Sequence, residues 1–84
     1  MLNTEQICKD AIEVVERYLA SDLVAADMHD ELREAQDAVD DAWDMSNSRK
    51  SHRICRAAWH ACLAAKNDER SLAKVSVNEF WDRV

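Results

Sequence analysis

Apolar side chains recur at helical spacing over the first twenty residues of the chain. Their positions follow the i, i+4, i+7, i+11 pattern of one helix face: Ile7, Ala11, Val14 and Tyr18. A second apolar row beside it widens that face to nearly half of the circumference: Cys8, Ile12, Val15 and Leu19. We expect the helix to begin at Asn3 or Thr4, because Gln6 follows Asn3 at the spacing of a capping box. A face this wide suits a helix that contacts two neighbours.

The same period returns over residues 22–45, on a rotated face. The apolar positions there are Met28, Leu32, Ala35, Val39, Ala42 and Trp43. If one straight helix ran through both segments, with about 100° of rotation per residue, this apolar face would be turned by about 100° from the first. One straight helix therefore cannot direct both faces at the same core. We therefore expect a break near Ser21 and Asp22, which are both good N-cap residues.

Residues 46–48, Ser-Asn-Ser, form the clearest turn of the chain. Asparagine tolerates the left-handed conformation that ends helices, and serine caps the helix that follows. A third helix over about 49–66 then directs small and apolar side chains inward: Ile54, Ala58, Ala61, Cys62 and Ala65. Because so many of these are alanines, neighbouring helices can approach closely. We expect Asn67 and Asp68 to end or kink this helix.

The last helix is predicted to begin at Ser76. Ser76 and Glu79 have the spacing of a capping box, and Val75 and Phe80 have the spacing of a hydrophobic staple around it. Residues 71–75 are ambiguous between a helical turn and a link. The predicted helix is therefore short and lies at the C-terminus.

Neither glycine nor proline occurs among the 84 residues. Glycine supplies the positive φ of many turns, and proline stops helices, so the chain has little means of forming hairpins or phosphate-binding loops. Together with the helical periodicity, this predicts an all-α fold in a single helical domain, residues 1–84. We expect a small antiparallel bundle of three longer helices and a short C-terminal helix, because the connections are short.

Charge is distributed unevenly along the chain. Residues 1–48 carry thirteen acidic and three basic side chains, a net charge of −10, whereas residues 49–84 carry four acidic and eight basic ones, a net charge of +4. The total of −6 repels nucleic acid and anionic membranes at long range and attracts basic protein surfaces. The asymmetry between the halves is more informative than the total.

The composition also bears on the compartment. No apolar run approaches the ~20 residues of a membrane span, and no cationic stretch precedes an apolar one at the N-terminus. The three cysteines, Cys8, Cys55 and Cys62, are an odd number, which we interpret as reduced thiols packed as small apolar residues. We therefore expect a protein of the bacterial or host cytosol that does not contact a membrane.

The most specific signal is an acidic stripe, which we define as Asp30, Glu34, Asp37, Asp41 and Asp44. These residues follow the i, i+4, i+7, i+11, i+14 spacing of one narrow helix sector. Like charges at i, i+4 cost an isolated helix about 0.2–0.5 kcal/mol per pair, so the stripe opposes helix stability. It is either a solvated face that gives solubility or a docking surface for a basic partner, in which the carboxylates imitate nucleic-acid phosphates. Bound Ca²⁺ or Mg²⁺ is disfavoured, because a straight helix seldom converges enough oxygen ligands.

The third helix carries the opposite charge. Its basic residues Arg49, Lys50, Arg53 and Arg56 suit phosphate contacts or a nucleic-acid groove, although the tight turn of a helix-turn-helix motif is lacking. Each charged stripe lies opposite the apolar face of its own helix, so we expect both to face outward rather than to pair. A solvated basic face and head-to-tail association through both stripes remain open interpretations.

Tryptophans and possible metal ligands complete the candidate residues. Trp43 and Trp81 are interpreted as core residues, whereas Trp59 lies on the flank of the third helix beside arginines, as an interface anchor would. Two histidines and two cysteines on that helix resemble a metal-binding set: His52, Cys55, His60 and Cys62. Ligands on one straight helix cannot surround a zinc ion tetrahedrally, so no metal and no cofactor is expected. Catalysis is not expected either, because neither a loop-built oxyanion hole nor an enclosed cavity is indicated.

These patterns favour a non-catalytic interaction protein that binds and blocks a basic, nucleic-acid-handling protein surface. The acidic stripe would supply charge complementarity and Trp59 an anchor. In size and charge the chain is like phage-encoded inhibitors, antitoxins and immunity proteins, an analogy that involves no shared motif. The alternatives are a small nucleic-acid-binding regulator acting through Arg49, Lys50, Arg53 and Arg56, and a self-assembling structural module.

Overall fold

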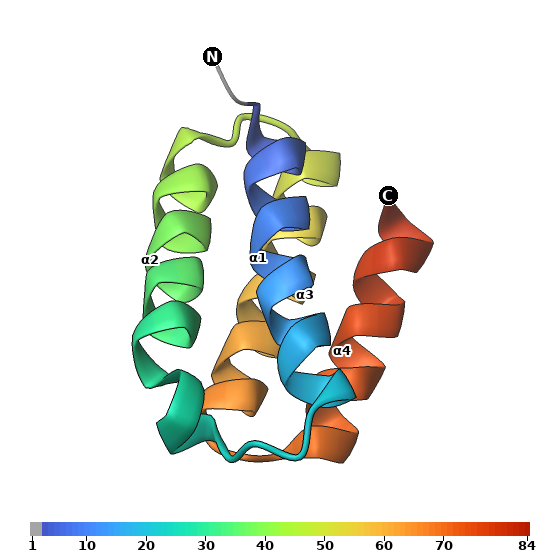
Figure 1. Ribbon diagram of the computed structural model, residues 1–84. Coiled ribbons are helices and arrows are strands. Elements are labelled where there is room, and N and C mark those ends of the chain that lie inside the picture. The colour runs from blue at the N-terminus through green and yellow to red at the C-terminus, as the bar shows by residue number, and fades with distance from the viewer. Residues whose placement is uncertain (1–2) are drawn as a thin grey trace.

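A computed structural model describes residues 3–84, which form four α-helices and one short 3₁₀ helix (Figure 1). The elements are α1 (Thr4–Ala20), the 3₁₀ helix η1 (Ala25–Met28), α2 (His29–Met45), α3 (Arg49–Lys66) and α4 (Arg70–Arg83). The chain reverses direction at each connection, so that consecutive helices lie side by side (Figure 1). The predicted all-α fold is confirmed for the described residues. Among them no helix is long and apolar enough to cross a membrane.

The helices α1 and α3 form the centre of the bundle. Both contact α2 on one side and α4 on the other, and α2 and α4 make no extensive contact with each other (Figure 1). The core between them combines large side chains, such as Tyr18, Leu32 and Phe80, with the alanines of α3. The outer faces of α2 and α4 therefore lie on opposite sides of the molecule.

The first and third helices begin at the caps that the sequence predicts. The Asn3 side chain accepts a hydrogen bond from the Gln6 backbone N–H at 2.7 Å, and the Ser48 hydroxyl accepts one from the Ser51 N–H at 3.1 Å. The expected break after the first helix is present, since α1 ends at Ala20 and Ser21 is its extended C-cap. The predicted start of the second helix near residue 22 is wrong: η1 comes first, and α2 begins at His29 without a side-chain cap. Ser21 closes α1 instead of starting the next helix, and η1 provides the turn that leads into α2.

The predicted start of the last helix is wrong. Helix α4 begins at Arg70, six residues before Ser76, which lies within the helix and is buried against the bundle. Val75 is 53% exposed, so the staple with Phe80 does not form. The capping-box spacing misleads because the i, i+3 pair is also compatible with the interior of a helix whose start is set elsewhere. The C-terminal helix is accordingly longer than predicted.

The start of α4 is set by a tight turn at Asp68. Asp68 has φ 56°, and its N–H donates to the carbonyl of Ala65, while the Glu69 N–H donates to that of Ala64. This is the Schellman arrangement, in which a left-handed residue closes a helix and is most often glycine. Aspartate is one of the few other residues that visit this region at moderate cost, because its short polar side chain can bond locally.

The side chain of Asp68 joins three separate segments. Its Oδ1 accepts hydrogen bonds from the Tyr18 hydroxyl and from the Ala25 backbone N–H, both at 2.7 Å. These bonds connect the end of α1 and the start of η1 to the α3–α4 turn. The two donors lower the pKa of the Asp68 carboxyl, and burial together with the bond to Asp68 raises the pKa of Tyr18.

Arg70 completes this junction from the first turn of α4. Its guanidinium lies 4.4 Å from the centre of the Tyr18 ring and donates at 3.3 Å to the carbonyls of Tyr18 and Leu19. It also donates to the carbonyl of Leu23 in the following loop. The last carbonyls of α1 are thus satisfied by a cation, which suits the negative end of the helix dipole.

The three cysteines are free thiols within the core. The sulfur atoms of Cys8 and Cys55 lie 3.6 Å apart across the α1–α3 contact, and Cys62 lies further along α3. Burial raises the pKa of Cys8 and of Cys55, and it raises the pKa of Cys62 to about 12. These thiols therefore serve as small apolar packing residues, as the sequence predicts, and are poor nucleophiles.

We predict that Asp68→Asn lowers the free energy of unfolding near neutral pH, because a neutral amide accepts from Tyr18 and Ala25 more weakly than a carboxylate. Asparagine tolerates the same left-handed φ, so the backbone of the turn is kept. The pKa of Asp68 is lower in the folded than in the unfolded chain. Its contribution is consequently present above the ordinary value near 3.8 and lost as the pH falls through the folded value. Urea unfolding should show the gap between wild type and variant closing below about pH 4.

Tyr18→Phe tests the same junction by removing the hydroxyl that donates to Asp68. Loss of one hydrogen bond should reduce the free energy of unfolding by about 1 kcal/mol and the Tm by roughly 4–8 °C. Combined with Asp68→Asn, the loss should be smaller than the sum of the two single losses, because both variants break the same bond. Strict additivity would show that Tyr18 and Asp68 do not interact in solution.

We also predict that the native protein resists thiol reagents. All three thiols are fully buried, so labelling requires local or global opening. Labelling with a chromogenic disulfide near pH 8 should be at least about 100-fold slower than in concentrated guanidinium, where three thiols per chain should titrate. Rapid labelling of one thiol in the folded protein would contradict the packing described here.

Candidate functional site

The acidic stripe covers the outer side of α2. All five of its members are exposed: Asp30, Glu34, Asp37, Asp41 and Asp44. They lie opposite the fully buried Leu32, Val39 and Ala42, which hold α2 on the bundle. In the part of the chain that the structure describes, only two ion pairs occur, Lys9–Glu5 at 3.4 Å and Arg17–Glu31 at 3.5 Å. None of the stripe carboxylates is neutralised by these pairs.

A shallow groove between α1 and α2 adjoins the stripe. It has a volume of about 490 Å³ and an apolar floor that includes Ile7, Val14, Ala38 and Met45. Met45 is 62% exposed, the largest exposure among the large apolar side chains of the described chain. Carboxylates border this floor from both helices: Asp10 on α1, and Glu31, Glu34 and Asp41 on α2. The one cation in the lining is Arg17, which pairs with Glu31. We call this feature the acidic groove.

The acidic groove was not predicted from the sequence, although two members of the stripe border it. Ala38 and Met45 lie beside the stripe on the α1 side of α2, where small and flexible side chains leave the floor uncovered. The sequence feature that could have indicated the groove is the pair Ala35 and Ala38, two small residues three apart beside the acidic stripe. Whether such a flank is filled or open depends on the neighbouring helix.

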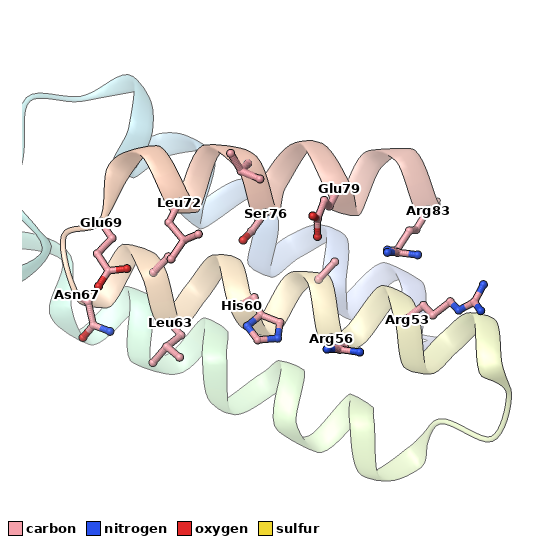
Figure 2. Close-up of a pocket in the computed structure, with 13 residues that line it drawn as sticks. Arg53, Arg56, His60, Leu63, Asn67, Glu69, Leu72, Ser76, Glu79 and Arg83 are labelled. Carbon is pink, nitrogen blue, oxygen red and sulfur yellow. The ribbon is translucent and has the colours of Figure 1, made fainter.

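The basic residues of α3 are also exposed. Arg53 and Arg56 line a second groove, between α3 and α4 (Figure 2). Arg49 and Lys50 lie in the first turn of α3, outside the groove lining. Within residues 3–84 no ion pair joins these cations to the acidic stripe. The Lys66 ammonium, at the other end of α3, instead donates to the Gln36 amide oxygen at 2.7 Å. As expected, the two stripes face outward rather than toward each other.

The tryptophans occupy three different environments. Trp43 and Trp59 are half-buried and meet edge to face across the α2–α3 contact, with ring centres 6.5 Å apart. The ring of Trp59 also meets that of the exposed His60 edge to face, with ring centres 5.5 Å apart. Trp59 lines neither the acidic groove nor the groove between α3 and α4. Trp81, expected in the core, is 43% exposed, and its indole N–H donates to Glu16 at 3.3 Å. Phe80 occupies the core position in its place.

The histidines and cysteines of α3 do not converge. Cys55 and Cys62 face the core, whereas His52 and His60 are exposed on the other side of the helix. Across residues 3–84, no group of three or more histidine, cysteine or carboxylate side chains is arranged to hold a metal ion. The surface chemistry that the structure offers is charge of two signs, each beside a groove that contains exposed apolar side chains.

Four-helix bundles carry many unrelated functions, so the fold does not specify an activity. Comparison with protein-family models, with curated proteins and with solved structures gives no match for this chain. Its function must therefore be inferred from its own surface, and the acidic groove with its stripe is the strongest candidate site.

Proposed function

We propose that this chain is a non-catalytic interaction protein that binds a basic protein surface through the acidic stripe and the acidic groove, and thereby blocks that surface. The observation that carries this proposal is the position of Glu34 and Asp41. Both belong to a row of unpaired carboxylates and both border an exposed apolar floor. Charge for attraction and apolar area for affinity are thus available on one face.

The carboxylates favour encounter with a basic partner. Exposed charges of one sign raise association rates and discriminate against partners of the wrong charge more than they add affinity. No cation pairs with the stripe among the described residues, and Arg17 in the adjoining groove pairs with Glu31, which is not a stripe member. The stripe costs helix stability, and a binding role gives a reason for keeping it.

The groove supplies the apolar part of the contact. An exposed methionine such as Met45 adapts to different partner side chains, because it is flexible and polarisable. Carboxylates line the α2 side of the floor, and Asp10 adds one on the α1 side, an arrangement that accepts a helix or an extended segment with lysine or arginine beside apolar residues. The partner is therefore expected to be basic and amphipathic rather than merely basic.

A nucleic-acid-handling partner fits the linear spacing of the stripe. Its five carboxylates span about 21 Å of helix axis, or about 5 Å each, compared with about 3.4 Å per phosphate along one DNA strand. The stripe therefore imitates a short length of phosphate backbone at reduced density. This is the type of surface that an inhibitor, antitoxin or immunity protein would present, and the three free thiols suit the reducing cytosol.

The alternative is a nucleic-acid-binding regulator that acts through α3. The exposed, unpaired side chains of Arg49, Lys50, Arg53 and Arg56 favour it. The acidic stripe lies on the adjacent helix and opposes approach to phosphates on that side. A gel shift with random duplex DNA at low salt, with and without Arg53→Glu and Arg56→Glu, separates this function from the leading one.

We predict that Asp37→Lys with Asp41→Lys weakens binding to a basic amphipathic helical probe, a labelled peptide of leucine and lysine, by about tenfold or more. Fluorescence anisotropy measures the binding. Circular dichroism should show unchanged helicity, because both residues are exposed and the change relieves repulsion between like charges.

The matched control is Asp22→Lys with Asp82→Lys. It changes the net charge equally, at exposed positions outside the stripe and outside the acidic groove. The control should bind the probe within about threefold of wild type, because the loss depends on position and not on total charge. Equal loss in both variants, or normal binding by the stripe variant, would refute the proposed site.

A further inference from the structure

The groove between α3 and α4 is larger than the acidic groove and lies elsewhere on the bundle. Its volume is about 880 Å³, and it runs along both helices from Arg53 to Asn67 on α3 and from Glu69 to Arg83 on α4 (Figure 2). The α3 side covers about 21 Å, or four helical turns. The function proposed above makes no use of this surface.

One half of the groove holds its large apolar side chains, with Asn67 and Glu69 at the extreme end (Figure 2). Leu72 and Val75, on the first turns of α4, are 52% and 53% exposed, and the half-buried Leu63 lies across from Leu72 on α3 (Figure 2). The floor between the helices consists of small side chains, including Ala57 and Ala64. Apolar side chains grouped over a small-residue floor leave room for side chains of another molecule.

The other half is basic. Arg53 and Arg56 on α3 and Arg83 on α4 gather at this end of the groove (Figure 2). Glu79 lies among them, yet no ion pair forms at this end within residues 3–84. Three guanidinium groups and one carboxylate leave a local excess of positive charge, on a chain whose total is −6.

We propose that the α3–α4 groove is a second docking site, which binds an acidic amphipathic helix of another protein. Arginines bind carboxylates through paired donors, and the apolar half accepts side chains that recur at i, i+4 and i+7 of the bound helix. The bound helix carries its carboxylates toward its C-terminus. Its C-terminal carbonyls then also face the arginines, so it runs in the same direction as α4. This inference does not depend on the function proposed for the acidic groove.

A second copy of this chain is a poorer occupant. Its acidic stripe has the right charge, but the outer face of α2 offers no large apolar side chain except Met45 at its end. Docked in the groove, α2 would leave Leu72 or Val75 uncovered. A helix that is both acidic and apolar satisfies both halves of the groove at once.

The test uses the intact chain and a fluorescein-labelled helical peptide of about 15 residues, with leucines at helical spacing and glutamates in its C-terminal half. Fluorescence anisotropy should show binding that weakens as salt rises. A peptide with lysine in place of each glutamate should not bind at the α3–α4 groove. Absence of binding by the acidic peptide would overturn the proposal.

Two variants locate the site, each with circular dichroism as a check of folding. Arg53→Glu with Arg56→Glu should weaken binding about tenfold or more, and Leu72→Ser with Val75→Ser should do so without changing the charge. The matched control is Arg49→Glu with Lys50→Glu, which makes the same charge change on α3 outside the groove lining and should leave binding within about threefold. Equal loss in the control would overturn the proposal in favour of a diffuse basic surface.

Further outcomes distinguish the remaining occupants. Salt-sensitive self-association in sedimentation that Arg53→Glu with Arg56→Glu abolishes would assign the groove to a second copy and overturn the proposal. Duplex DNA that displaces the peptide would assign it to nucleic acid, with the same consequence. Asp37→Lys with Asp41→Lys should leave binding of the acidic peptide intact, so failure at the acidic groove and failure here are separable.

Discussion

The carboxylate of Asp68 is the interaction on which the arrangement of this bundle depends. A chain without glycine must place another residue at the left-handed position that closes α3, and Asp68 takes it at φ 56°. The same side chain binds Tyr18 and Ala25, which are 50 and 43 residues away in the sequence. One residue therefore closes α3 and joins the α3–α4 turn to α1 and η1. The conformational cost of the turn is offset by bonds that form only when the turn is made.

That junction also determines what α4 presents to its surroundings. Because α4 begins at Arg70, its first two turns place Leu72 and Val75 beside α3, and its last turn brings Arg83 to the arginines of α3. The alanines of α3 allow its neighbours to pack closely, so the grooves have shallow floors of small side chains between walls of long ones. Each groove takes its charge from the helix that borders it, acidic from α2 and basic from α3. The molecule thus presents two surfaces of opposite sign, each beside exposed apolar area.

Helix starts that depend on neighbouring residues could be predicted from the sequence, whereas those that depend on distant contacts could not. The starts of α1 and α3 followed from Asn3 and Ser48, because a cap is formed by residues three apart and needs no partner elsewhere. The start of α4 could not be found this way, since it depends on Tyr18 and Ala25 reaching Asp68. Trp81 shows the same limit. Its large apolar ring suggested the core, but Phe80 fills that place, and the indole instead covers the flank of α1 and bonds Glu16.

The sequence by itself determined the helical class, the first and third helices, the end of the second, and the outward direction of both charged stripes. Each of these follows from periodicity, since a residue opposite the apolar face of its helix must face away from the core. Only the tertiary structure decided where apolar side chains stay exposed. Met45, Leu72 and Val75 lie on the flanks of their helices, and a flank is covered or open according to the distance and angle of the next helix. Those two quantities are set by contacts between residues far apart in the chain, so the grooves do not follow from any local pattern.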